Sequence, residues 1–120
     1  MRHNESMEDY LETILLLSKK LPVVRSVDIA TELGYKKSSI SIAMKNLRTK
    51  GYITVSDAGF INLTDSGKAL AENVYERHQF FTNWLISLGV DEETASEDAC
   101  QLEHVISQES FEAIKKAVQI

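Results

Sequence analysis

The chain has 120 residues, of which 43% are hydrophobic and 26% charged, a composition that fits one globular domain or two small ones and argues against intrinsic disorder. No apolar run approaches the roughly 20 residues of a membrane-spanning helix, and no signal-peptide stretch follows Met1, so we expect a cytoplasmic protein with no membrane association. The single cysteine, Cys100, excludes an internal disulfide and agrees with a reducing compartment.

The formal net charge of −5 is unevenly distributed along the chain. Residues 1–63 hold nine basic and seven acidic residues, whereas residues 64–120 hold four basic and eleven acidic ones. Five of the basic residues fall between Lys36 and Lys50, a segment without an acidic residue. Such a segment can bind a polyanion locally, although on charge alone a solvated helix face explains it equally well. The shift in charge predicts a boundary between domains 1–63 and 64–120.

Three helices are predicted in the first 50 residues from apolar periodicity and capping residues. Ser6 and Ser26 are the expected N-caps of the first two. Pro22 ends the first helix and Gly34 the second. The predicted ranges are Ser6–Lys20, Val27–Leu33 and Ser38–Thr49.

Two short β-branched or aromatic runs follow, Tyr52–Val55 and Phe60–Leu63, and the turn-rich loop between them predicts a β-hairpin. Three more helices are expected after the hairpin, the last one capped by Ser107; their ranges are 64–88, 91–106 and 107–118. The fold class is therefore mostly α with a small β-hairpin. Helix, short helix, tight connection, basic helix and hairpin is the order of an N-terminal winged helix-turn-helix, here followed by an all-helical domain; an unrelated small α+β domain with the same order is the alternative.

In a winged helix-turn-helix the basic helix enters the major groove of DNA and the hairpin lies on the backbone. We therefore expect lysines that hold phosphates, hydroxyls that reach phosphates or base edges, and a wing tip at Asp57–Phe60. The predicted DNA-binding residues are Lys36, Lys37, Ser38, Ser39, Ser41 and Lys45.

Side chains that ligate divalent transition metals gather at helical spacing in two places. One pair lies three residues apart in the first helix, a set at i, i+3 and i+4 lies in the fifth, and a histidine lies in the fourth. Each has an ordinary alternative role: a carboxylate favoured by the helix dipole, a small core cysteine, or a surface histidine. The candidate ligands are Asp9, Glu12, His78, Cys100, Glu103 and His104.

Several stretches are similar to the diphtheria-toxin-repressor family, the iron- and manganese-dependent repressors of bacteria and archaea. The similarity covers about residues 6–119, with the motifs in the family's order. It implies a homodimeric, metal-activated repressor that binds a palindromic double-stranded DNA operator, with Mn²⁺ or Fe²⁺ as cofactor and Zn²⁺ or Co²⁺ as substitutes in vitro. The stretches are 6–14 (SMEDYLETI), 27–30 (VDIA), 63–68 (LTDSGK), 77–78 (RH) and 100–107 (CQLEHVIS).

The resemblance assigns all six candidate ligands to metal and mixes two branches of the family. Asp9 and Glu12 look like the manganese branch, whereas Cys100 looks like the iron branch. Thr82 stands where the iron branch has a further carboxylate ligand, and Ile42 stands on the base-reading helix where a polar residue is common.

The resemblance also implies that the helical second domain, 64–120, forms the dimer. Phe80, Phe81, Trp84 and Leu85 give the fourth helix more apolar surface than a small domain readily covers, which favours a dimer contact, with core packing as the alternative.

Two other classes of function remain open. Cys100 and His104 on one helical face suggest the nucleophile and base of an enzyme, but no glycine-rich anion loop accompanies them. A small helical protein that stores metal without binding DNA would use the same ligands and leave the basic helix and hairpin unexplained.

Overall fold

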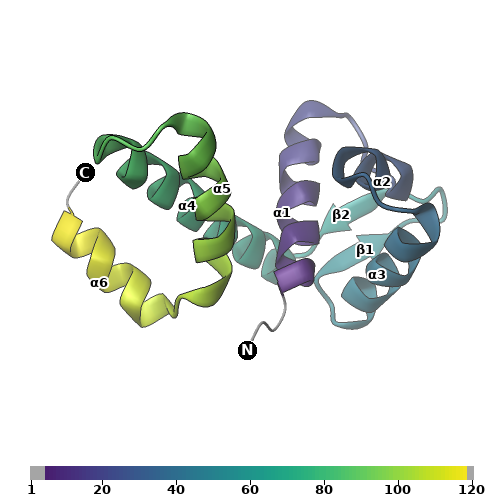
Figure 1. Cartoon of the computed structure of the whole chain (residues 1–120). Coiled ribbons are helices and arrows are strands. Elements are labelled where there is room, and N and C mark those ends of the chain that lie inside the picture. The colour runs from purple at the N-terminus through teal and green to yellow at the C-terminus, as the bar shows by residue number, and fades with distance from the viewer. Residues whose placement is uncertain (1–4, 119–120) are drawn as a thin grey trace. The chain divides into compact units, whose positions relative to one another are not determined.

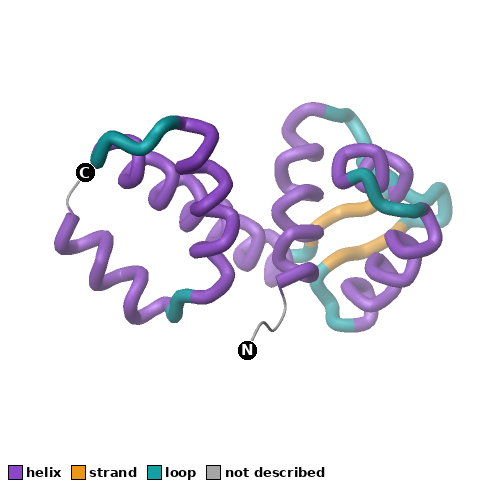
Figure 2. The backbone as a smooth tube through the Cα atoms, in the orientation of Figure 1, coloured by secondary structure: helices purple, strands orange, loops and turns teal. Residues whose placement is uncertain are grey.

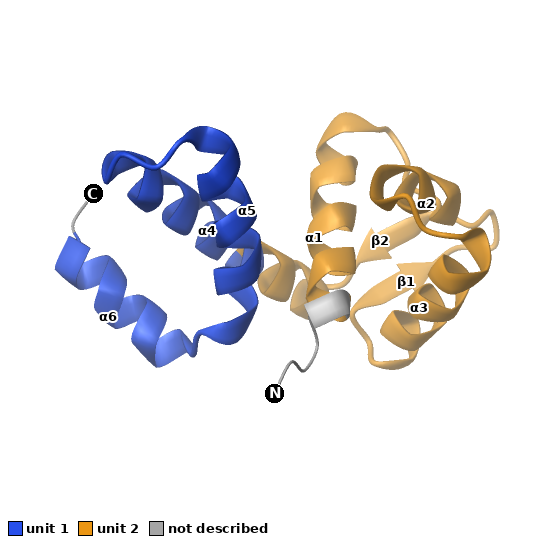
Figure 3. Cartoon of the chain, in the orientation of Figure 1, with its two compact units in different colours: residues 1–3, 73–120 blue, residues 4–72 orange. Residues whose placement is uncertain are grey.

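The computed structural model describes residues 5–118, with side chains from Met7, and contains six helices and one antiparallel hairpin within that range (Figures 1 and 2). This confirms the predicted fold class. The described residues form two compact units, named here in chain order: the first unit, residues 5–72, is orange in Figure 3, and the second unit, residues 73–118, is blue. The elements are α1 (Glu5–Lys20), α2 (Ser26–Leu33), α3 (Lys37–Thr49), β1 (Ile53–Val55), β2 (Ile61–Leu63), α4 (Asp65–Ser87), α5 (Glu92–Val105) and α6 (Gln108–Val118).

Helix α1 supplies much of the core of the first unit, because its apolar residues recur on one face. Leu11 and Ile14 are fully buried there. The helix begins at Glu5, so Ser6 lies inside it rather than at its N-cap, and the cap position lies outside the described residues. Its end at Lys20, two residues before Pro22, agrees with the prediction.

The start of α2 differs from the prediction, because Ser26 is its first helical residue and Arg25 holds the N-cap position. The Asp28 carboxylate accepts a hydrogen bond of 2.9 Å from the Arg25 backbone N–H, so the third helical residue reaches back to satisfy the cap. At the other end Gly34 adopts a φ of +72° and its N–H donates to the Ala30 carbonyl, as expected for a left-handed C-cap.

Helix α3 presents two different faces. Ile40, Met44 and Leu47 are buried against the rest of the first unit. The helix starts at Lys37, one residue before the predicted Ser38, and is followed by Gly51 at a φ of +84°. Packing of these buried residues fixes α3 in the first unit and leaves the opposite face of the helix exposed.

The hairpin is one residue shorter per strand than predicted, because Tyr52 and Phe60 lie outside the ladder. A backbone hydrogen bond of 2.7 Å from Ile61 to Val24 ties β2 to the segment before α2. The Arg25 guanidinium lies 4.8 Å above the Phe60 ring, a cation–π contact at the base of the wing. The strand pairs are Ile53 with Leu63, Thr54 with Asn62, and Val55 with Ile61.

The first turn of α4 is fixed to the residues before β1. Thr64 caps the helix: its hydroxyl donates to the Gly51 carbonyl at 2.7 Å and accepts from the Gly67 N–H at 3.2 Å. Gly67 is buried, and a Cβ at that position would overlap the Tyr52 carbonyl oxygen. The close approach of helix and strand therefore requires a glycine here.

The core of the second unit is aromatic. Phe81 and Phe111 are fully buried with their ring centroids 5.7 Å apart, and Phe80 and Trp84 pack against them. Of the two roles open for the apolar residues of α4, core packing therefore applies to Phe81, and Phe80 and Trp84 are partly buried against the same core. The Phe111 side chain of α6 packs against the aromatic residues of α4 and so covers them.

Ser107 caps α6 as predicted, whereas Asp91, predicted as the first residue of α5, is its N-cap and α5 starts at Glu92. Asp91 accepts a hydrogen bond of 3.2 Å from the Thr94 N–H, and Ser107 accepts one of 3.1 Å from the Ser110 N–H. None of the helices in the described part of the chain combines the length and apolar character that crossing a bilayer requires.

Candidate metal centre and nucleic-acid interface

The outward face of α3 is mostly polar and basic. All six residues predicted to bind DNA are exposed, from the helix N-cap to its third turn: Lys36, Lys37, Ser38, Ser39, Ser41 and Lys45. Ile42 interrupts this face and is 65% exposed. The face has the composition that favours a polyanion, and its charge is not offset by acidic residues on the same helix.

An open groove of about 210 Å³ continues this face toward α2 and β1. Arg48 and Ser26 line it and were not among the predicted DNA-binding residues. Arg48 lies three residues after Lys45 and so shares its side of the helix, which is the sequence signal that identifies it. The full lining is Ser26, Ser41, Met44, Lys45, Arg48 and Val55.

The predicted wing tip is a tight turn. The Gly59 N–H donates to the Ser56 carbonyl at 2.9 Å, and Gly59 has a φ of +85°. The Ser56 hydroxyl accepts from the Phe60 N–H at 3.1 Å. Asp57 and Ala58 are exposed, whereas Phe60 is half-buried under Arg25 and so belongs to the base of the wing.

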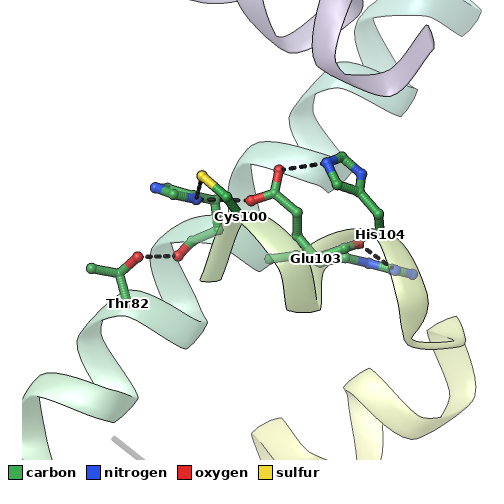
Figure 4. Close-up of polar contacts among 6 residues, drawn as sticks. Thr82, Cys100, Glu103 and His104 are labelled. Atoms are coloured by element: carbon green, nitrogen blue, oxygen red, sulfur yellow. Dashed lines mark hydrogen bonds and ion pairs between the residues drawn. The ribbon is translucent and has the colours of Figure 1, made fainter. Parts of the chain in front are cut away.

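Glu103 on α5 is a buried carboxylate with only 1% of its surface exposed. One carboxylate oxygen lies 2.8 Å from His78 Nδ1 on α4, and the other lies 3.5 Å from His104 Nε2. Figure 4 shows the carboxylate between the Cys100 sulfur and the His104 ring. A buried carboxylate is unfavourable without a compensating charge or hydrogen bond, so its burial between two imidazoles makes Glu103 the centre of the candidate site.

Cys100 lies beside the same histidine, with its Sγ 3.8 Å from His78 Nδ1. One ligand atom each of His78, Cys100 and Glu103 lies within 4.8 Å of the other two. Donors that share one ion at about 2.0–2.3 Å lie roughly 3–4 Å apart, so the thiolate, imidazole and carboxylate fit a single divalent transition metal.

The ordinary alternatives fit two of these residues poorly. Cys100 is exposed, so it is not a small core residue. The His104 side chain is only 3% exposed, so it is not a surface histidine. The His78 side chain is 23% exposed, so partial exposure at the surface still describes this histidine.

Thr82 lies one turn after His78 on α4. Its hydroxyl donates to the His78 backbone carbonyl at 2.7 Å, a contact also drawn in Figure 4. This hydroxyl is bonded within its own helix and does not supply the carboxylate ligand of the iron branch.

Arg77 is a positioning residue that the ligand pattern did not reveal. Its guanidinium donates to the backbone carbonyls of Glu103 at 3.1 Å and Ile106 at 2.7 Å, and to the Gln108 side chain at 2.8 Å. Arg77 therefore holds the last turn of α5 and the start of α6. Its position next to His78 is the only sequence signal for this role, because the partners are 26 or more residues away.

Asp9 and Glu12 lie on α1, in the first unit, and both are half-buried. They are the fifth and eighth residues of the helix, beyond the first turn to which a favourable helix-dipole effect is confined. A favourable interaction with the helix dipole therefore does not explain the positions of these two carboxylates on α1.

Both units match models of one protein family. Residues 3–59 match the N-terminal DNA binding domain of the iron dependent repressors, and residues 64–119 match their metal binding and dimerisation domain. The transcriptional regulator MntR of Escherichia coli is 36% identical over 96% of this chain and 74% of its own length. An uncharacterized HTH-type transcriptional regulator of Methanocaldococcus jannaschii is 36% identical over 93% of this chain and 91% of its own.

Solved structures show the same fold. The metal-dependent transcriptional regulator MtsR superposes with a TM-score of 0.87 at 27% identity, covering 99% of this chain. The manganese regulator SloR superposes with a TM-score of 0.82 at 26% identity, covering 93%. This chain spans about half the length of either, 55% and 53%. The relatives are named as regulators rather than enzymes, and the chain belongs to the diphtheria-toxin-repressor and MntR family of metal-dependent transcriptional repressors.

Proposed function

We propose that this chain is a homodimeric, cytoplasmic repressor of manganese or iron homeostasis genes that binds a palindromic DNA operator when Mn²⁺ or Fe²⁺ is bound. The observation that carries the proposal is the buried Glu103 carboxylate, which faces His78 and His104 beside Cys100. The same chain carries an exposed basic helix in a winged helix-turn-helix. Metal-ligand chemistry and a DNA-binding face thus occur together.

Six residues are proposed as the ligands. His78, Cys100, Glu103 and His104 belong to the second unit, and the family resemblance adds Asp9 and Glu12 from α1. A divalent cation held by these residues would supply positive charge that compensates the carboxylates among its ligands. The α1 carboxylates make the first unit responsive to the site, since α1 packs on α2 and β2 through a shared core.

The metal preference follows from the mixture of donors. Cys100 offers a soft thiolate, which favours Fe²⁺, Co²⁺ and Zn²⁺, whereas carboxylates favour Mn²⁺. A structurally similar protein, a manganese-dependent transcriptional repressor in complex with manganese, supports Mn²⁺ as a cofactor. We infer a regulator that responds to Mn²⁺ and Fe²⁺ in the cell and binds Zn²⁺ or Co²⁺ more tightly in vitro.

The DNA contacts are assigned to the exposed face of α3. Lys36, Lys37 and Lys45, with Arg48 in the adjoining groove, hold phosphates, and the serine hydroxyls reach phosphates or base edges. A dimer presents two copies of α3 to two half-sites, which is the reason to propose a palindrome. Ile86, Leu88 and Val105 remain exposed in the second unit and are available for the dimer contact.

Lys45→Ala tests the phosphate assignment. It should weaken binding to every duplex and lower the slope of log affinity against log salt by about one per subunit, because one phosphate contact is lost. The measurement is fluorescence anisotropy over a salt series. Lys20→Ala, which removes an exposed lysine at the end of α1, should leave the slope unchanged; an unchanged slope for Lys45→Ala would remove that residue from the interface.

The proposal as a whole is tested by selection from a random duplex library under anaerobic conditions with Mn²⁺, Fe²⁺, Zn²⁺ or Co²⁺, and with chelator. We expect enrichment of an inverted repeat only in the presence of metal, by a protein that sediments as a dimer. Tight metal binding without enrichment of any duplex would overturn the proposal in favour of a storage protein, and a stable monomer in all conditions would overturn the homodimer.

A further inference from the structure

Ile42 is an apolar residue at the centre of a polar face. It is 65% exposed, whereas the other isoleucine of α3, Ile40, is fully buried. Its neighbours at helical spacing are Ser39 and Lys45, three residues away on either side, and both are exposed. Ile42 therefore does not serve the core of the first unit, and its exposure is unfavourable in water.

The major groove of DNA offers such a side chain one kind of partner. Guanine, adenine and cytosine edges present hydrogen-bonding atoms, and the C5-methyl group of thymine is the apolar group among the four bases. An isoleucine placed over a polar edge would remove water from a donor or acceptor without replacing its hydrogen bond. Placed over thymine, it buries a methyl group and its own exposed surface together.

We propose that Ile42 reads a thymine methyl group in each half-site and is a specificity-determining residue of this protein. The inference rests on the proposed DNA-binding function and adds to it the base and the group that is recognised. The lysines around Ile42 bind phosphates whatever the sequence, whereas Ile42 distinguishes thymine from the other bases.

The test replaces single thymines by deoxyuridine, which pairs identically but lacks the methyl group. The probe is the duplex that the wild-type protein enriches from the random library, with one thymine replaced at a time, in the metal that supports enrichment. For wild type we expect one thymine per half-site whose replacement lowers affinity about fourfold, and about fifteenfold when both half-sites are changed.

Variants assign that sensitivity to the side chain. Ile42→Ser should bind the thymine and uracil duplexes with equal affinity, and Ile42→Val should keep the preference. Lys45→Ala is the matched control on the same face, and it should weaken binding to both duplexes equally and so retain the ratio. Because Ile42 is exposed, unfolding curves of these variants should match that of wild type, which checks that the fold is intact.

The outcomes separate this inference from the function on which it rests. A wild-type protein that tolerates uracil at every position, or an Ile42→Ser variant that keeps the thymine preference, would overturn the role of Ile42 while leaving metal-dependent DNA binding intact. Failure of the wild type to enrich any duplex with any metal would instead overturn the proposed function, and this inference with it.

Discussion

At the scale of single residues, the chemistry of the second unit centres on Glu103. Its burial, and its contacts with His78 and His104, make it the residue whose charge most needs compensation. The i, i+3, i+4 spacing of Cys100, Glu103 and His104 predicted that they share one side of α5. The spacing could not show that His78 would join them, because that depends on how α4 packs against α5.

Positioning residues are harder to predict than ligands. Arg77 donates hydrogen bonds to the backbone carbonyl oxygens of Glu103 and Ile106. Because every residue type has a backbone carbonyl, no pattern of side chains in the sequence predicts this contact. Ile42 is the opposite case: its departure from the polar pattern of α3 is visible in the sequence, and the structure adds that it is exposed.

Cys100 gives the most direct spectroscopic test of the ligand set. The Co²⁺ form of the wild-type protein should show a sulfur-to-metal charge-transfer absorption, because a thiolate ligand donates to the ion. Cys100→Glu should abolish this absorption and lower the affinity for Co²⁺ and Zn²⁺ more than for Mn²⁺. Thr82→Ala, which changes a hydroxyl bonded to the backbone, should keep the band. A wild-type Co²⁺ spectrum without a thiolate band would show that Cys100 is not a ligand.

At the scale of elements, the apolar periodicity of the sequence predicts which segments are helices and their order, and the differences from the structure lie at the ends of the helices and strands. Ser26 was predicted as a cap because serine commonly fills that position, but Asp28 reaches back to the Arg25 N–H and shifts the helix start by one residue. The hairpin strands are shorter than their β-branched runs because Tyr52 and Phe60 serve the turn regions that flank the ladder.

Gly67 is an element-scale constraint that the sequence shows only as a glycine inside a helical pattern. Gly67→Ala should destabilise the protein by about 1–3 kcal/mol, because the new methyl group would overlap the Tyr52 carbonyl and push α4 away from β1. Urea unfolding measures the loss. Lys68→Ala, at the next and exposed position, should change stability by less than about 0.5 kcal/mol; equal stabilities of the two variants would contradict the close approach.

Asp91 links the start of α5 to pH. Hydrogen bonds from the Thr94 side chain and backbone N–H lower the pKa of its carboxyl group below 3.8. A lowered pKa stabilises the fold above the unfolded value, and this contribution is lost as pH falls through the folded value. Asp91→Ala should therefore be less stable than wild type at neutral pH, and the difference should shrink in acid below pH 3.8.

Asp91→Asn is the matched control, because it keeps an N-cap acceptor without a charge. Its stability relative to Asp91→Ala should not vary with pH. Urea unfolding of the metal-free protein over a pH series makes the comparison, and a wild-type advantage that persists unchanged in acid would show that the carboxylate charge plays no part.

At the scale of the whole molecule, the position of the charged residues along the chain predicts a nucleic-acid partner better than the net charge does. The net charge of −5 disfavours nucleic acid, yet the exposed face of α3 gathers the basic residues that the sequence placed between Lys36 and Lys50. The aromatic residues of α4 show the limit of such reasoning. Their number suggested an interface, but Phe81 lies in the core because Phe111 of α6 packs against it, and a contact between distant helices has no local signature.

The central claim is that metal at the Glu103 centre controls DNA binding, and one measurement tests it most directly. Anisotropy titrations of the enriched duplex compare wild type, Glu103→Gln and the exposed α6 control Glu112→Gln, each with Mn²⁺ and with chelator. Mn²⁺ should raise the affinity of wild type and Glu112→Gln by at least about tenfold, within the usual range of allosteric coupling. Glu103→Gln should show no metal response. Equal wild-type affinity with Mn²⁺ and chelator, or a full response in Glu103→Gln, would contradict the claim.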